Sequence, residues 1–175
     1  MYPRITERSY GYLNAGVGSN NIFPSFRFGG ELYQVFSRAF ELSAGIRFLA
    51  YETADVWVYT GSVSKYHRNY WLSYRALVTA IENEQTLTHQ INARRYFGSR
   101  YHYVGLWAVY GNAPVQFVTL NEIRRLNSSI GGLDYQFSIA THTTLRVATE
   151  FQREEFIENE FRNRLSIELT LAKRF

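Results

Sequence analysis

Four histidines are the side chains best suited to catalysis in this 175-residue sequence: His67, His89, His102 and His142. Nucleophilic catalysis needs a nucleophile, a base and an orienting group within reach of one another. None of the four stands with a serine at a spacing typical of Ser-His catalysis, and no two lie at i and i+2 on one strand to ligate a metal. The pattern predicts no catalytic residue, no metal site and no cofactor, and it favours an interfacial or turn position for each ring.

An acidic cluster near the C-terminus offers a second kind of chemistry. It contains Glu154, Glu155, Glu158 and Glu160, and the sequence predicts a loop at 154–159. Its oxygens could hold a divalent cation or bridge to cation-decorated lipopolysaccharide. A solvated loop explains the cluster more simply, and we expect no metal there.

The glycines match no phosphate-cradling spacing. We interpret them as bends where a small barrel must turn tightly. The nine glycines that we interpret in this way, out of twelve in the chain, are Gly16, Gly18, Gly29, Gly30, Gly61, Gly105, Gly111, Gly131 and Gly132.

The elements that must position these residues follow from a period of two. The last fourteen residues, RNRLSIELTLAKRF, alternate strictly between polar and apolar side chains, and their apolar set is Leu165, Ile167, Leu169, Leu171 and Phe175. The same alternation predicts about ten strands along the chain, within a range of roughly eight to twelve. We place them near 7–17, 24–36, 39–50, 54–66, 69–81, 86–97, 101–111, 124–138, 142–153 and 160–175.

The length of these strands favours a membrane. They run for about 10 to 16 residues, whereas strands of soluble sandwiches usually have ~5 to 6 and a tilted membrane strand needs ~9 to 11. Connections are predicted to be short at 37–38, 67–68, 98–100 and 139–141, and longer at 18–23, 112–123 and 154–159. Short periplasmic turns and longer outer loops are typical of outer-membrane barrels, although 51–53 and 82–85 are short on the long-loop side. A secreted sandwich or a lipocalin-like barrel stays the soluble alternative.

Composition sets further bounds. Aromatic residues make up 17% of the sequence, with 14 Tyr, and they gather near predicted strand ends as in the aromatic girdles of membrane barrels. The net charge of +4 comes from interspersed acidic and basic residues, which argues against nucleic acid as a partner. The stretch 102–121 contains Gly105, Gly111 and Pro114, so we predict no membrane-spanning helix. Without a composition shift or an internal repeat, residues 1–175 are predicted to form a single barrel domain.

If the apolar side of each strand faces lipid, the opposite side forms a lumen. In a barrel of this size the lumen is just wide enough for side chains to fill. We therefore expect a polar network whose charges pair with one another, because an unpaired buried charge is costly. The predicted lumen-facing residues are Arg27, Glu31, Glu41, Arg47, Arg75, Arg94, Asp134, Arg146, Glu150, Arg164 and Glu168.

Two stretches carry a resemblance to a known family. DVWVYTGSVSKYHRNYWLSYRALV at 55–78 and INARRYFGSRYHYVGLWAVYG at 91–111 resemble strands of the YaiO-type family of outer-membrane β-barrel proteins. The resemblance implies export to the outer membrane of a Gram-negative bacterium and contact with its lipid and lipopolysaccharide. It also implies that the C-terminal strand, with its apolar set and terminal Phe175, is the signal read by the barrel-assembly machinery. The family supplies no catalytic residue to carry over.

The leading hypothesis is an all-β, antiparallel transmembrane barrel that is a structural anchor or scaffold of the cell envelope, with other envelope proteins as partners. A second hypothesis is a narrow channel for small anionic or polar solutes, favoured by the excess of arginine in the predicted lumen. A third, which the residues favour least, is a barrel enzyme that modifies lipid or polysaccharide.

Overall fold

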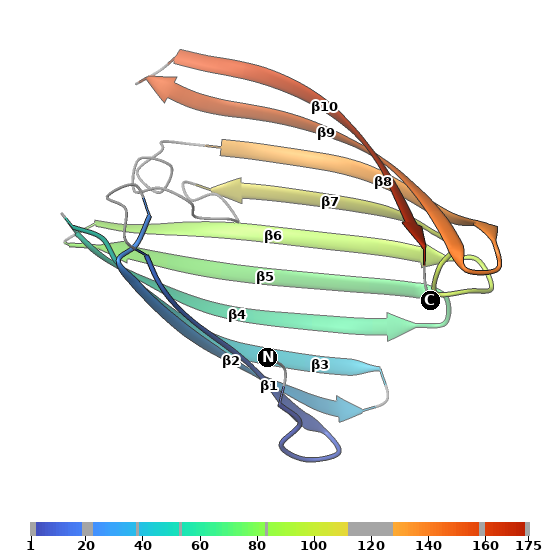
Figure 1. The fold of residues 1–175 in the computed structure, drawn as a ribbon, viewed down its shortest axis with the longest axis horizontal. Coiled ribbons are helices and arrows are strands. Elements are labelled where there is room, and N and C mark those ends of the chain that lie inside the picture. Colours follow the sequence, from blue (N-terminus) through green and yellow to red (C-terminus); the bar gives the residue numbers. More distant parts are fainter. Residues whose placement is uncertain are drawn as a thin grey trace.

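A single antiparallel sheet contains every strand of the protein that the structure describes. The computed structural model describes residues 3–18, 23–37, 39–52, 54–82, 84–111, 128–157 and 160–173. The strands follow one another in chain order, each paired with the next, as Figure 1 shows. They are β1 (Ser9–Val17), β2 (Phe26–Ser37), β3 (Phe40–Ala50), β4 (Asp55–His67), β5 (Tyr70–Ile81), β6 (Glu84–Tyr96), β7 (Tyr103–Gly111), β8 (Ser128–Ala140), β9 (Thr143–Ile157) and β10 (Glu160–Lys173). The prediction of about ten antiparallel strands is confirmed.

β9 is longer than the sequence analysis predicted. It continues to Ile157, so Glu154 and Glu155 lie in the strand, and Glu160 opens β10. The predicted loop at 154–159 is therefore wrong: only residues 158–159 separate the two strands. Polar side chains hold the extension together across the two strands, which compensates for its low apolar content. Glu158 of the acidic cluster and the terminal Phe175 lie outside the described residues.

The sheet has two distinct ends. At one, the turn end, the connections 38–39, 68–69, 97–102 and 141–142 join the strands, and β1 begins and β10 ends there. The other, the loop end, carries the connections 18–25, 51–54, 82–83, 112–127 and 158–159. Three of the loop-end connections are as short as those at the turn end, so the predicted contrast in length is limited to 18–25 and 112–127. Among the described residues, no helix is long or apolar enough to cross a membrane.

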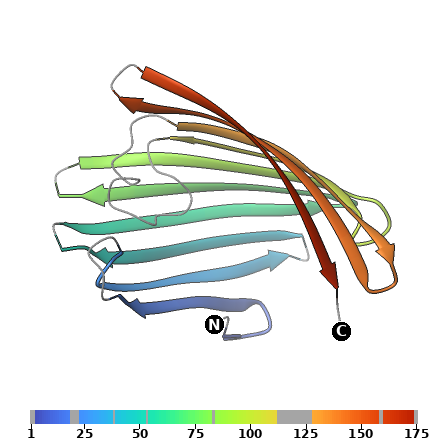
Figure 2. The ribbon, with the colours of Figure 1, turned by 45° about the horizontal axis from the view of Figure 1, so that its top comes forward.

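The two faces of the sheet differ in character. On the inner face, the pairing register sets Glu31, Gly45, Thr60 and Leu77 side by side, and all but Gly45 are buried. The outer face carries the apolar set of β10, whose four described members, Leu165, Ile167, Leu169 and Leu171, are each about two-thirds exposed. β1 and β10 form the two edges of the sheet. Figure 2 shows these two strands at opposite sides, with the C-terminal half of β10 bending across the sheet toward the side of β1.

Candidate functional site: the polar inner face

All eleven residues predicted to line a lumen lie on the inner face. Their cross-strand partners show this, because residues directly opposite each other in a sheet share a face. Arg47, for example, is opposite Gly29, Arg94 is opposite Gly105, and Glu150 is opposite Gly132. That this face encloses a lumen stays a prediction, but the side chains that would fill it are brought together here.

Glu31 and Arg75 form the centre of the largest polar network. The Arg75 Nη2 and Nη1 atoms donate to Glu31 Oε1 and Oε2 at 2.9 and 3.0 Å, a two-pronged geometry that strengthens such pairs. Ser43 Oγ donates to Glu31 Oε1 at 2.6 Å, and Arg75 Nη1 also donates to Thr60 Oγ1 at 3.2 Å. The Glu31 side chain is only 3% exposed, so its charge is both buried and fully partnered.

A glycine makes this ion pair possible. Glu31 on β2 is directly opposite Gly45 on β3, and Arg75 reaches Glu31 from β5, two strands beyond Gly45. A Cβ atom built at Gly45 would lie 2.7 Å from the Gly30 carbonyl oxygen and 2.8 Å from the Glu31 Cβ. The absence of a side chain at Gly45 thus leaves space for the close approach of Gly30 and Glu31 on β2. Gly45 is not among the glycines that the sequence analysis interpreted as bends.

Asp134 and Arg146 form a second network on β8, β9 and β10. Arg146 Nε donates to Asp134 Oδ2 at 3.0 Å, and its Nη1 reaches Glu168 Oε1 at 3.5 Å. The Asp134 side chain is 3% exposed and lies over Gly105, where a Cβ atom would come within 2.2 Å of Asp134 Oδ1. A buried acid that is paired with an arginine and has a glycine opposite it therefore recurs on the second half of the sheet.

The sequence analysis missed a third network near the loop end. Arg162 Nε donates to Glu154 Oε1, Gln152 Nε2 donates to Glu154 Oε2 at 2.6 Å, and Arg164 Nη2 donates to Gln152 Oε1. Arg164 thus pairs with an amide rather than with an acid. Arg146, Glu150, Gln152 and Glu154 have the same parity in β9, so continuing the alternation beyond residue 153 would have revealed the role of Glu154.

Aromatic side chains take the place of oppositely charged partners beside Glu41 and Arg94 on the inner face. The Tyr10 hydroxyl donates to Glu41 Oε2 at 2.8 Å, while its ring stacks on Tyr33 with centroids 4.6 Å apart. The guanidinium of Arg94 lies between Trp71 and Tyr103, with its central carbon 5.3 and 4.7 Å from their ring centroids. Cation–π contacts of this kind stabilise a charge without an acid.

Three of the predicted residues have no such partner. Arg27 and Arg47 lie against Gly16 and Gly29, their direct cross-strand partners. Within the part of the chain that the structure describes, no ion pair joins either arginine or Glu150 to another residue. The charges near the loop end of β2 and β3 are therefore less satisfied than those of the Glu31 network.

The inner face is not polar throughout. Toward the loop end, Leu49, Tyr51, Val56, Val58, Leu77 and Ile81 form an apolar cluster. Val56 and Val58 are completely buried. The sequence analysis named only polar residues for this face and did not identify the apolar cluster, because alternation shows which residues share a face but not whether the face is uniform.

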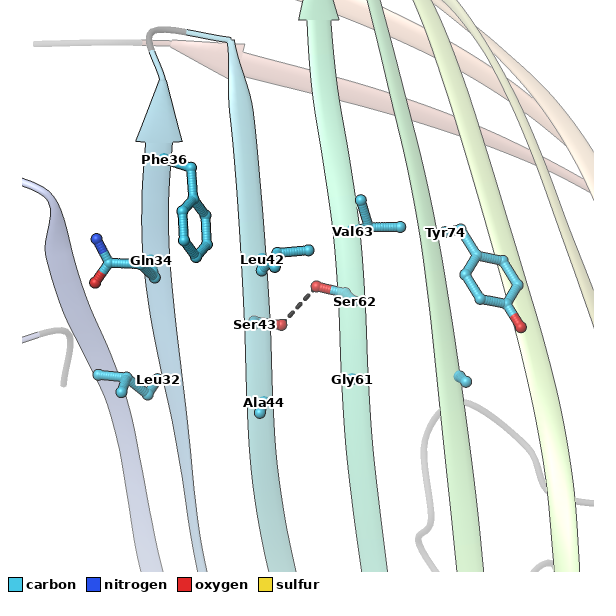
Figure 3. Close-up of a pocket in the computed structure, with 11 residues that line it drawn as sticks. Leu32, Gln34, Phe36, Leu42, Ser43, Ala44, Gly61, Ser62, Val63 and Tyr74 are labelled. Carbon is cyan, nitrogen blue, oxygen red and sulfur yellow. Dashed lines mark hydrogen bonds between the residues drawn. The ribbon is translucent and has the colours of Figure 1, made fainter.

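The outer face has a hollow over β2 to β5, drawn in Figure 3. It has a volume of about 560 Å³ and is lined mainly by apolar side chains, among them Leu32, Phe36, Leu42, Val63 and Tyr74. Its floor is low because small residues meet there: Ala44 is opposite Gly61, which is opposite Ala76. Ser43 and Ser62, whose hydroxyls lie 2.5 Å apart, belong to the inner face behind it.

The histidines lie apart from the charged networks. His67 ends β4 and His142 lies in the turn before β9, as predicted. His89 lies in the middle of β6 rather than near its end, and its Nδ1 is 2.7 Å from the Tyr74 hydroxyl. His102 Nε2 is 2.9 Å from the Tyr135 hydroxyl. Among the described residues, no group of three or more His, Cys, Asp or Glu could hold a metal ion.

The comparison with protein families decides the class of the sheet. The model of the YaiO membrane β-barrel domain matches residues 1–116. The chain belongs to this family. The resemblance seen in the sequence is confirmed, and the ten-stranded sheet is that of a membrane β-barrel.

The match to the YaiO domain covers β1 to β7, so it includes the Glu31 network, the apolar cluster and the outer hollow. The networks of Asp134 and Glu154, on β8 to β10, lie beyond it. No curated protein and no solved structure matched the chain.

Proposed function

We propose that the chain is a non-conducting barrel of a bacterial outer membrane that anchors or scaffolds other components of the envelope. One observation carries this proposal: the inner face has ion-paired charges centred on Glu31, Asp134 and Glu154 and, toward the loop end, an apolar cluster. Completely buried Val56 and Val58 leave no room for water beside them, and conduction through a pore needs a continuous hydrated path. A filled barrel of about ten strands suits a structural role.

The outer membrane is the proposed location because closed antiparallel barrels with an even number of strands are typical of it. In density-gradient fractions of a Gram-negative envelope, the protein should accompany lipopolysaccharide and not the inner-membrane markers. The scaffold role predicts that mild detergent releases the protein in a complex of defined composition. Release only as a single chain would count against that role.

Planar-bilayer recording tests the filled interior. The wild-type protein should give no unitary current at any voltage, although protease protection shows that it has inserted. A variant with Val56, Val58 and Leu77 all replaced by serine should conduct if the apolar cluster closes the lumen, and it serves as the control for insertion. A stable unitary current from the wild type would contradict the proposal.

The channel for small anions is the second candidate, and the observation that favours it is the arginine pair at 27 and 47, which has no ion pair among the described residues. The same recording under a salt gradient decides it, because a channel lined by these arginines should select anions.

We also propose that the barrel is not an enzyme. Alanine replacement of each histidine, of Glu150 and of Glu168 should leave the lipid and polysaccharide composition of the envelope unchanged. A change in that composition with the fold intact would favour the barrel enzyme.

A further inference from the structure

A second cavity lies at the turn end, outside the three polar networks. It has a volume of about 320 Å³ and is lined by Tyr66, Arg68, Asn69, Tyr96 and Arg100, together with Gly98 and Ser99. Tyr66 and Tyr96 come from the inner face of β4 and β6, while the others come from the turns that follow these strands. We call this cavity the turn-end pocket.

The backbone holds Arg68 in an unusual conformation. Its φ angle is +53°, in the left-handed region where glycine and asparagine are usual and most other residues are strained. A two-residue hairpin turn such as 68–69 needs this geometry, yet it does not need an arginine. Residues in strained backbone conformations are frequent at binding sites, where the fixed backbone sets the position and direction of the side chain.

The cations of the turn-end pocket lack acidic partners. No ion pair joins Arg68 or Arg100 to a carboxylate among the described residues, and no acidic side chain lines the pocket. Arg100 donates instead to the Tyr101 hydroxyl and stacks on its ring. Two arginines beside one pocket repel each other, so an anion between them would relieve the repulsion.

The two ends of the sheet differ in the sign of their described charges. Described charges near the turn-end connections are mainly basic: Arg4, Arg8, Lys65, Arg68, Arg95, Arg100 and Lys173, against Glu7 and Glu41. Those near the loop end are mainly acidic: Glu52, Asp55, Glu82, Glu84, Glu154, Glu155 and Glu160, against Arg27, Arg47, Arg153 and Arg162. The potential at the turn end therefore attracts anions toward the pocket.

We propose that the turn-end pocket binds a phosphate group. The forked guanidinium groups of Arg68 and Arg100 match phosphate oxygens, and the amide of Asn69 and the tyrosine hydroxyls add neutral donors. The Tyr66 and Tyr96 rings provide walls for the glycerol or sugar part of a phosphate ester. The source of the phosphate is the headgroup of an anionic phospholipid at the membrane surface or a soluble phosphate ester.

Calorimetric titration of the folded protein in neutral maltoside micelles tests the site, with inorganic phosphate, glycerol 1-phosphate and glycerol as probes. The wild type should bind the two phosphates and not glycerol. The variant Arg68→Gln/Arg100→Gln should weaken binding at least roughly tenfold, the effect of losing about one charge-assisted hydrogen bond. The control Lys65→Gln/Arg95→Gln removes two cations from the same end but none from the pocket, and it should change the affinity less than about twofold.

A second arm distinguishes the two sources. Nanodiscs of phosphatidylcholine with or without phosphatidylglycerol replace the micelles. In a Trp57→Phe/Trp107→Phe background, quenching of Trp71 fluorescence by a phosphatidylglycerol that carries a nitroxide on its headgroup reports a headgroup in the turn-end pocket. Quenching that needs Arg68 and Arg100 identifies the headgroup, whereas binding of the soluble probes alone identifies a phosphate ester. Absence of binding in both arms, or equal loss in the two double variants, would overturn the proposal.

Discussion

Glu31 is the one acid of its hydrogen-bonded network among the described residues, and its buried carboxylate is stabilised by the Arg75 guanidinium. Burying a charge is costly, and the two-pronged ion pair with the hydrogen bond from Ser43 offsets that cost. Removing one member of such a pair destabilises the fold more than removing both, because the remaining charge stays buried without a partner. A buried pair can therefore be recognised by comparing a single with a double substitution.

Replacing Arg75 by methionine should destabilise the barrel by about 3 to 5 kcal/mol, because Glu31 is left buried without a cation. The double variant Glu31→Gln/Arg75→Met should recover much of that loss. Urea unfolding in lipid vesicles, followed by the heat-modifiable shift in gel mobility, measures both. The matched control is Lys65→Met, which removes an exposed cation from the outer face. Equal destabilisation by the single and the double variant would show that Arg75 contributes packing and not charge.

At the scale of the strands, alternation identified the residues that share a face, and this is why all eleven predicted positions lie on one side of the sheet. It could not reveal the glycine vacancies, because the role of Gly45 depends on Glu31, which is its partner only once the register is known. Alternation also could not reveal the apolar cluster at Val56 and Val58. Apolar residues at positions expected to be polar look like isolated breaks in the alternation until the neighbouring strands are placed. The end of β9 was missed because Glu154 and Glu155 look like a loop until Arg162 is placed opposite.

The vacancy at Gly45 predicts a difference between two glycines. Gly45→Ala should cost about 1 to 3 kcal/mol of stability, because backbone atoms of Gly30 and Glu31 must move to admit a Cβ. Gly61→Ala on the outer face should cost far less, since the atom nearest to the added Cβ, the Ser43 carbonyl oxygen, is 3.8 Å away. The same unfolding assay compares them. Similar losses in both variants would mean that glycine matters here for the backbone and not for the space it leaves.

At the scale of the whole molecule, closing the sheet requires β1 to pair with β10. For ten strands tilted by about 35 to 45°, with a rise of about 3.3 Å per residue and a spacing of about 4.8 Å, the stagger on closure is roughly 10 to 14 residues. The pairing registers place Ala15 level with residue 159 before closure, so a stagger of about 12 residues would pair it with residue 171 or with residue 147. Only the first of these lies in β10. This register sets Ala15 beside Leu171 and Val17 beside Leu169, all on the outer face.

Two features of the structure agree with this register. The Gly11 amide donates to the Pro3 carbonyl at 2.8 Å, and Arg4 forms a bridge with Tyr10, so the beginning of β1 is covered by residues 3–5. The C-terminal part of β1, which contains Ala15 and Val17, therefore remains available to pair with β10. The C-terminal half of β10 also bends toward the side of β1 in both views (Figures 1 and 2).

A disulfide between cysteines introduced at Ala15 and Leu171 should therefore form readily in the membrane-inserted protein, which contains no native cysteine. A cysteine pair at Ala15 and Leu165 is the control, since it belongs to a much smaller stagger. Non-reducing gels of the two variants report the register. Cross-linking of the control pair alone would contradict the proposed closure.

The central claim is that the outer face of the sheet contacts lipid while the inner face is filled and dry. Nitroxide labels placed one at a time at residues 164–171 of β10 in liposomes test both halves of this claim, using oxygen as the apolar collision reagent and a nickel chelate as the polar one. Collisions with oxygen should peak at Leu165, Ile167, Leu169 and Leu171, and labels at the alternate positions should be poorly accessible to both reagents. Access of the nickel chelate to the alternate positions would reveal a water-filled pore, and loss of the period of two would contradict a membrane barrel.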